Sequence, residues 1–214
     1  MKKEFSTKPE KMEEAWPGEF TSFSWKELIT AIPSSMFLVT GWKANGKENA
    51  SLQMYSSFIT DSGELICIMG WVRKDGHMYK SLKETGCCVL NFPSSDIKEQ
   101  AFMTIRNNQY ETDEITASGL TVEKAVAVNA PRIAECFLNI ECELLWEQQN
   151  FDHSNQTVVA LKAVHICMDS DRYDQDKLGR YGKTGYMYGI YSARNPDTNV
   201  AKEDEYGIVE FIKE

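Results

Sequence analysis

The strongest constraint on the fold is a series of apolar segments, each about as long as a β-strand, with turn-forming residues between them. These segments are residues 35–42, 49–59, 64–71, 87–92, 132–147 and 156–168. Asn45-Gly46 and Asp61-Ser62-Gly63 favour tight connections between antiparallel strands. We therefore expect a mainly β fold, a β-barrel with α additions.

Only short helices are predicted among these strands. Residues 24–27 have the spacing of a capping box, which opens a helix that Pro33 ends. A second helix is predicted at 76–84, where Gly86 can terminate it. A third is predicted from about residue 95 to residue 106.

The length of 214 residues, 42% of them hydrophobic, favours one large globular domain. We predict a charged N-terminal arm at 1–23 and a barrel domain at 24–170. A C-terminal extension at 171–214 is expected to pack on the barrel or on a partner subunit.

The charge pattern excludes several kinds of partner. The net charge is −9, and no basic stripe is present that could release counterions from phosphates, so we expect no nucleic acid partner. Residues 1–16 carry charges where an export segment would be apolar, and no run approaches the roughly 18 apolar residues of a membrane span. We expect a cytoplasmic protein with no membrane partner.

The cysteines raise the question of a thiol or metal site, most of all Cys136 and Cys142 in the segment 130–147. In a strand they would share the apolar face and lie about 20 Å apart, too far for a disulfide or a shared metal. There is no CxxC pair among the six cysteines. We expect buried core cysteines. The other face carries Glu135, Asn139, Glu141 and Glu143, and we expect the glutamates to face water or a partner subunit.

Other catalytic motifs are incomplete. Residues 177–184 end like a phosphate-binding P-loop, but the first glycine is replaced by Lys177 and no apolar strand precedes it. His77, His153 and His165 have no metal-ligand spacing, and a GxGxxG motif is missing. The sequence predicts no catalytic side chain and no metal site.

A row of polar side chains is predicted along one face of the segment 49–59. A half-solvated strand would explain this row. It could also meet the polar edge of a flat heterocycle such as an isoalloxazine, which offers hydrogen-bond acceptors and a donor along one edge. The row consists of Asn49, Ser51, Gln53, Tyr55 and Ser57, while Ala50, Leu52, Met54 and Phe58 take the other face.

The next segment brings two cations to a helix start. Arg73 and Lys74 leave a strand just before the helix that begins near Gly76, where backbone N–H groups could hold an anion such as a phosphate. An ordinary charged surface loop is the alternative.

In order and spacing, several segments resemble the flavin reductase-like, FMN-binding split-barrel family, and within it the flavoredoxin branch. They are "FLVTG", "NASLQMYSSF", "HMYKSLKETGCCVLNFPSS", "DEITASGLT" and "NAPRIAECFLNIECELL", within residues 34–168. The resemblance implies a six-stranded split β-barrel with short flanking helices, and a homodimer that holds FMN near the subunit interface.

The resemblance also implies the flavin contacts. The flavin would be lined by Asn49, Ala50, Ser51, Gln53, Tyr55, Ser56 and Ser57. Its phosphate and ribityl chain would be approached by Arg73, Lys74, His77, Tyr79 and Lys80. The chain departs from the family where many relatives have Asp-Pro-Pro and it has Asp61-Ser62-Gly63, and where Met78 replaces a threonine.

The function that the resemblance implies is an NAD(P)H:flavin oxidoreductase, or a flavoredoxin-like electron carrier with a small molecule or a protein as electron acceptor. A non-enzymatic FMN-binding or storage protein, and a barrel that kept only an interaction role, remain alternatives. The Tyr- and Gly-rich segment 179–191 could close over the flavin or pack on a partner chain.

Overall fold

The computed structural model describes residues 1–22, 24–173, 185–190, 195, 197–198 and 205–208. It divides the chain into two compact units. The smaller unit comprises residues 1–34 and 188–207, and the larger unit comprises 35–187 and 208–214. The predicted flavin site lies wholly in the larger unit.

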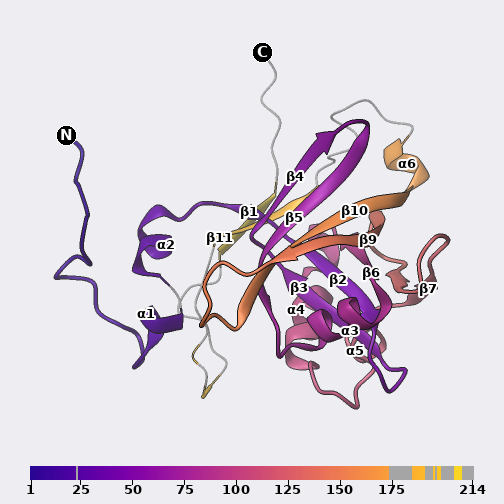
Figure 1. Cartoon of the computed structure of the whole chain (residues 1–214), viewed down its shortest axis with the longest axis horizontal. Helices are drawn as coiled ribbons and strands as arrows, with labels where there is room; N and C mark the ends of the chain where they lie inside the picture. The colour runs from indigo at the N-terminus through magenta and orange to yellow at the C-terminus, as the bar shows by residue number, and fades with distance from the viewer. Residues whose placement is uncertain (23, 174–184, 191–194, 196, 199–204, 209–214) are drawn as a thin grey trace. The chain divides into compact units, whose positions relative to one another are not determined.

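A seven-stranded antiparallel sheet forms the body of the larger unit (Figure 1). Its strand order is β3-β2-β6-β9-β10-β5-β4. The strands are β2 (Phe37–Trp42), β3 (Glu48–Gln53), β4 (Ser56–Asp61), β5 (Glu64–Arg73), β6 (Cys87–Phe92), β9 (Leu138–Gln148) and β10 (Gln156–Met168). The predicted mainly β architecture with short helices is confirmed.

The single strand predicted at 49–59 is wrong, because the chain breaks at Met54 and Tyr55 into β3 and β4. Tyr55 has a left-handed backbone, with φ 56°, which an extended strand does not allow. β3 and β4 then lie at opposite ends of the sheet order. This break adds a strand to the six that the family resemblance implies and leaves the barrel open.

The strand predicted at 132–147 is also two strands. β8 (Pro131–Ile133) pairs with β7 (Val122–Lys124), and β9 begins only at Leu138. Between them the chain turns, with the N–H of Cys136 donating to the carbonyl of Ile133 at 3.2 Å. The expected alternation therefore starts after the turn, not at residue 132.

Cys136 and Cys142 are both 1% exposed, so the prediction of buried core cysteines is confirmed. They belong to two different core clusters, Cys142 to the one inside the curved sheet and Cys136 to the one under the helices. Glu141 does not face water as expected. It is fully buried, and its carboxylate accepts hydrogen bonds from the backbone N–H groups of residues 126–128.

Short helices cover β2 and β3 (Figure 1). They are α3 (His77–Thr85), the 3₁₀ helix η1 (Ser95–Ile97), α4 (Lys98–Arg106) and α5 (Glu114–Ala117). α3 and α4 match the predicted helices. Gly86 ends α3 in the left-handed conformation, φ 69°, with its N–H on the carbonyl of Leu82.

The remaining elements are small. A three-stranded sheet has the order β1-β11-β12. These elements are α1 (Glu19–Ser22), α2 (Trp25–Thr30), β1 (Ser34–Ser35), α6 (Ser170–Tyr173), β11 (Met187–Ile190) and β12 (Glu205–Ile208). Ser24 caps α2 by accepting a hydrogen bond from the N–H of Lys26. Among the described residues, no helix has the length and apolar character needed to span a membrane.

Candidate flavin site

The open seam of the sheet, between β3 and β4, is the candidate site. The two-residue connection between Gln53 and Ser56 is held against β5 by a backbone hydrogen bond and a ring contact. The N–H of Gly70 donates to the carbonyl of Tyr55 at 2.9 Å, and the rings of Tyr55 and Trp71 meet edge to face at 5.5 Å. Trp71 shares the left-handed backbone of Tyr55, with φ 56°. The seam therefore has one end held by a pair of aromatic residues.

Polar side chains gather at this seam. The amide of Gln53 donates to the hydroxyl of Ser51 at 2.8 Å, and both residues are half-buried. The hydroxyls of Ser35 and Ser56 lie 3.1 Å apart. Amides and hydroxyls can each donate and accept hydrogen bonds, so these groups match a heterocycle edge of mixed character.

The backbone of β3 adds polar groups on the same open edge. The bond from the N–H of Lys43 to the carbonyl of Lys47 fixes which residues of the β2–β3 pair exchange hydrogen bonds. Hydrogen-bonded and non-hydrogen-bonded pairs alternate along the two strands. Ala50 and Leu52 therefore point their backbone N–H and C=O groups away from β2. The N–H of Ala50 donates to Glu114 at 2.9 Å, as the alternation requires. The backbone groups of Leu52 point toward the open edge.

The predicted polar row is confirmed only up to Gln53. Ser51 and Gln53 pair with Val39 and Phe37, two residues of the core inside the sheet, so they share that inner face. Ser57 is exposed and pairs with Ile68, whereas its neighbour Ser56 pairs with the core residue Met69. The break at Tyr55 thus reverses the alternation and turns Ser57 to the outer face, while Phe58 faces inward.

Asn49 and Ala50 are buried where α3 and α5 cover β3, so they line no open surface. The side-chain nitrogen of Asn49 and the hydroxyl of Ser81 in α3 are buried, and within the described residues neither has a hydrogen-bond partner. Buried polar atoms of this kind fit a polar ligand atom or an ordered water. Gly41 pairs with Asn49, and its missing side chain leaves room for Ser81. A Cβ at Gly41 would lie 3.2 Å from the Cβ of Ser81.

Sequence reasoning did not identify Ser81. The signal that could have found it is the helical spacing of Met78, Ser81 and Leu82, the three buried residues of α3. A serine in an otherwise apolar buried stripe marks a position whose hydroxyl needs a partner.

The two cations predicted to approach an anion are directed apart. Arg73 forms an exposed ion pair with Asp75 at 2.8 Å, and its hydrogen bond lowers the pKa of the Asp75 carboxyl to about 2. The ammonium of Lys74 donates instead to the side-chain oxygen of Gln149, in the loop between β9 and β10. Arg73 is therefore neutralised locally, whereas the partner of Lys74 is uncharged.

The three predicted residues of α3 also have distinct environments. His77 lies 3.5 Å from Glu114, whose carboxylate forms a buried ion pair with Lys43 at 2.7 Å. The hydroxyl of Tyr79 donates to the carboxylate of Glu147 at 3.3 Å. Lys80 is exposed. Among the described residues, no carboxylate forms an ion pair with Lys80, which is thus an exposed cation in the first turn of α3.

The structure does not bring the three histidines together at a metal site. Within the described part of the chain, no group of three or more His, Cys, Asp or Glu side chains could hold a metal ion. The P-loop-like segment 177–184 lies outside the described residues. Of segment 179–191, Tyr186 packs edge to face on Phe92 and Phe137, with ring centroids 5.6 and 4.9 Å apart.

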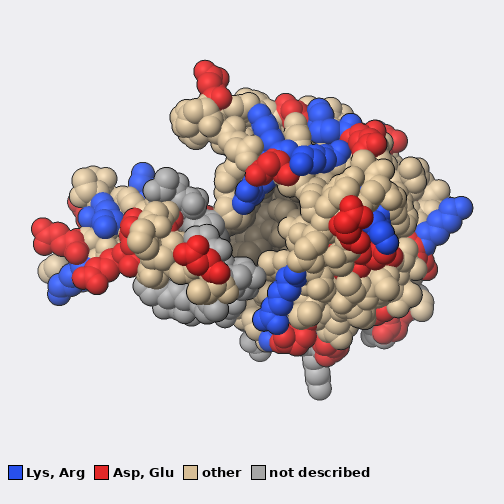
Figure 2. Space-filling model, turned by 90° about the horizontal axis from the view of Figure 1, so that it is seen from below, with Lys and Arg blue, Asp and Glu red and all other residues tan. Residues whose placement is uncertain are grey.

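Charges of both signs are interspersed over the larger unit on the face shown in Figure 2. Lysine and arginine side chains there lie beside aspartate and glutamate side chains.

The family model described as "Flavin reductase like domain" matches residues 29–188. The chain belongs to this family. The match covers the whole seven-stranded sheet and the helices that cover it, and it confirms the family resemblance seen in the sequence. A curated relative, a protein of Methanothermobacter thermautotrophicus, is 24% identical over 115 residues. The match spans about half the length of that relative, 53% of each chain.

Solved structures with the same fold include members with named flavin functions. A protein of Shewanella frigidimarina NCIMB 400 with a split-barrel domain has a TM-score of 0.71 and 17% identity, covering 95% of this chain and 98% of that one. Flavoredoxin of Desulfovibrio vulgaris (Miyazaki F) has a TM-score of 0.66 and 20% identity, with 85% and 90% covered. The NADH:FAD oxidoreductase SgcE6 of Streptomyces globisporus C-1027, in complex with NAD and FAD fragments, has a TM-score of 0.58 and 12% identity, with 83% and 92% covered. The split-barrel fold expected for this flavin reductase-like chain is confirmed.

Proposed function

We propose that this flavin reductase-like protein binds FMN at the open seam between β3 and β4. It would act as an NAD(P)H:flavin oxidoreductase or as a flavoredoxin-like electron carrier. The observation that carries the proposal is the outer edge of β3, which pairs with no further strand among the described residues. There the backbone of Leu52 and the side chains of Ser51 and Gln53 offer hydrogen-bonding groups at the opening of an apolar core. The family match supports a flavin as the heterocycle.

The residues present fit a flavin ring. Its polar edge requires both donors and acceptors, which the Leu52 backbone, Gln53 and Ser56 can supply. The aromatic pair Tyr55 and Trp71 provides apolar surface at the closed end of the seam. A bound flavin would supply the redox chemistry, namely hydride and electron transfer. The side chains then only bind and orient, which agrees with the lack of a predicted acid or base.

We assign the phosphate and ribityl end to α3. Lys80 and the first-turn backbone N–H groups of the nine-residue helix favour an anion, and His77 and Tyr79 lie in the same turn. The buried pair Asn49 and Ser81 has two polar atoms that a ribityl hydroxyl could satisfy. Arg73 has further guanidinium N–H donors, but its ion pair with Asp75 neutralises its charge.

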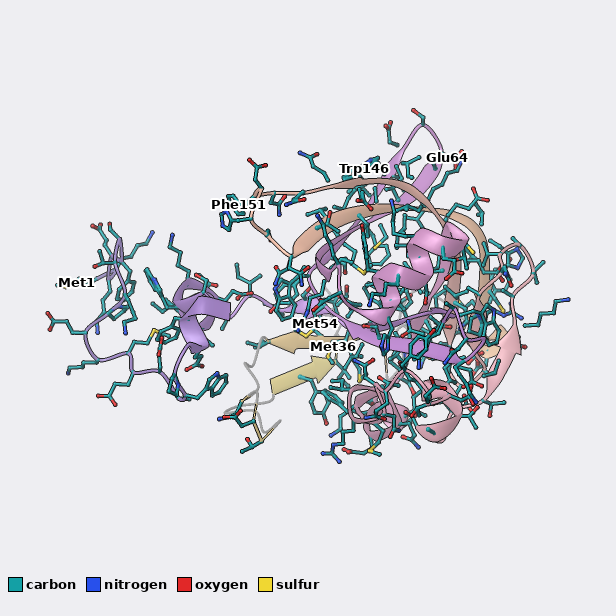
Figure 3. All side chains as sticks on the ribbon, turned by 60° about the horizontal axis from the view of Figure 1, so that its bottom comes forward. Met1, Met36, Met54, Glu64, Trp146 and Phe151 are labelled. Carbon is teal, nitrogen blue, oxygen red and sulfur yellow. The ribbon has the colours of Figure 1, made fainter. Side chains whose placement is uncertain are left out.

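We further propose a homodimer. The outer face of the sheet carries a row of solvent-exposed apolar side chains. Ile59 is 47% exposed and Trp146 is 42% exposed. Strand pairing places the half-buried Ile66 and Ile68 on this same face, between them. Figure 3 marks Trp146 on β9. A second copy of the chain is the occupant that the family resemblance favours.

A cytoplasmic location is part of the proposal. It is supported by the cysteines, since all six are free thiols, as is usual in a reducing compartment.

The deciding experiment is the absorption spectrum of the purified protein, followed by release and identification of the flavin and by anaerobic addition of NADH or NADPH. We expect a flavin band, FMN on release, and bleaching by one of the two nucleotides. A protein that binds FMN but is not bleached would be a flavin-binding or storage protein. Failure to take up FMN at micromolar concentration would refute the site.

A further inference from the structure

Side-chain and backbone hydrogen bonds hold the loop between β9 and β10 in place. The side-chain amide of Gln149 donates to the carbonyls of Phe151, Asp152 and Ser154, at 2.6, 3.0 and 3.3 Å. The backbone N–H of Lys74 donates to the carbonyl of Asn155 at 2.9 Å. One amide therefore organises the loop, and a backbone bond attaches it to the end of β5.

This loop displays an aromatic pair to solvent. Phe151 is 65% exposed, and its ring stacks on that of His153 with centroids 6.0 Å apart and planes 24° apart. Phe151 lies near the tip of the β9–β10 hairpin (Figure 3) and belongs to none of the core clusters of the described residues. Core packing does not explain a large apolar ring held at this position. Its open face can stack on a flat aromatic ligand.

A cation for which the described residues supply no acidic partner lies against the same loop. The ammonium of Lys74 donates to the neutral side-chain oxygen of Gln149, and across the described residues no carboxylate lies within ion-pair distance of it. The neighbouring Arg73 is neutralised by Asp75. An ammonium has three donors, so Lys74 can hold a phosphate oxygen while keeping its bond to Gln149.

A flat aromatic ring and a phosphate at a short separation are the two ends of an adenine nucleotide. We propose that Phe151, stacked on His153, and Lys74 form a subsite for the adenosine diphosphate part of the nicotinamide dinucleotide. This proposal rests on the function proposed above. Lys74 is three residues beyond Trp71 at the seam, a span of about 10 Å at most. One dinucleotide could therefore reach from the flavin seam to the loop.

The test uses ADP-ribose, which contains the adenosine diphosphate part and lacks the nicotinamide. Its binding to the flavin-loaded protein is measured by calorimetry for the wild type, Phe151→Ala, Lys74→Ala and Leu145→Ala. Leu145 is the matched control, an apolar β9 residue that is 50% exposed outside the loop. We expect Kd to rise about tenfold for Phe151→Ala and for Lys74→Ala, the usual effect of losing a base stack or a charged contact. Leu145→Ala should bind like the wild type.

Two results would overturn the subsite: no binding of ADP-ribose to the wild type, or an unchanged Kd for Phe151→Ala. Circular dichroism and the FMN Kd of each variant show that the fold and the seam are intact. If the protein takes up no flavin, the proposed function fails, and the same titration on flavin-free protein still decides whether the loop binds the nucleotide.

Discussion

Gln53 and Ser56 are only three positions apart in the chain, yet they belong to strands at opposite ends of the seven-stranded sheet. The left-handed backbone of Tyr55 between them ends one strand and starts the other in a new direction. The sheet consequently curves into a barrel that stays open at this point. The same break decides which side chains of the segment can line the opening.

Gln53 and Ser57 should therefore differ in their effect on flavin binding. Gln53→Ala removes a half-buried amide at the seam and should weaken FMN binding by about 1 kcal/mol, roughly fivefold in Kd. Ser57→Ala should not change Kd, because Ser57 is exposed on the outer face. Quenching of flavin fluorescence on titration measures both. A larger rise in the FMN Kd for Ser57→Ala than for Gln53→Ala would support the continuous polar row and contradict the proposed site at the seam.

The ion pair of Lys43 and Glu114 should be important for stability. Both side chains are 1% exposed, and Glu114 also holds the N–H of Ala50 on the edge of β3. Glu114→Gln leaves the Lys43 charge buried without its carboxylate and should lower the free energy of unfolding by about 3–5 kcal/mol. Denaturant unfolding of the apo protein measures this loss.

The control is Glu64→Gln, which removes the carboxylate of the exposed pair with Lys162. Water already solvates both of those groups, so its unfolding curve should overlay that of the wild type. Equal losses in the two variants would show that burial of the Lys43 pair has no special role.

Gly41 should be required for the close approach of α3. Gly41→Val places carbon atoms where the Cβ alone would already be 3.2 Å from Ser81, so we expect a loss of about 1–3 kcal/mol from overpacking. Ser81→Gly in the same chain should recover part of that loss, and a double-mutant cycle by chemical unfolding measures the coupling. Strictly additive effects would mean that the two positions do not touch.

Much of the architecture could be predicted from the sequence because its signals are local. The turn at Asn45-Gly46 and the end of α3 at Gly86 follow from backbone preferences of those residues alone. The two missed strand breaks had no such signal. Tyr55 adopts a positive φ without being glycine or asparagine, and the turn before Leu138 contains neither glycine nor proline.

The arrangement of the candidate site was predicted less well, because its polar groups come from long-range packing. Alternation along one strand identified Ser51 and Gln53, but could not show that Asn49 would be covered by α3 or that Ser81 would face it. Nor does the sequence show the partner of Lys74, because Gln149 lies on a loop that is 75 residues later in the chain.

Thiol chemistry should separate one cysteine from the other five. Cys167 is half-buried, while Cys67, Cys87, Cys88, Cys136 and Cys142 are buried. Burial raises the pKa of the Cys67 thiol to about 12, so it stays neutral and unreactive in the folded chain. Iodoacetamide at pH 8 should modify one thiol per native chain by intact mass, and none in Cys167→Ser. Modification of two or more thiols without unfolding would contradict the packed core.

The same pKa shift predicts how the free energy of unfolding changes at alkaline pH. A thiol whose pKa is raised in the folded state contributes stability that is fully present below the unfolded pKa of about 8.5 and is lost as pH rises toward the folded value. Cys67, with a folded pKa of about 12, should therefore help to lower the free energy of unfolding progressively between about pH 8.5 and pH 12. Urea unfolding at pH 8 and at pH 10 measures the change. A midpoint that rises with pH would mean that the buried thiols ionise in the folded state.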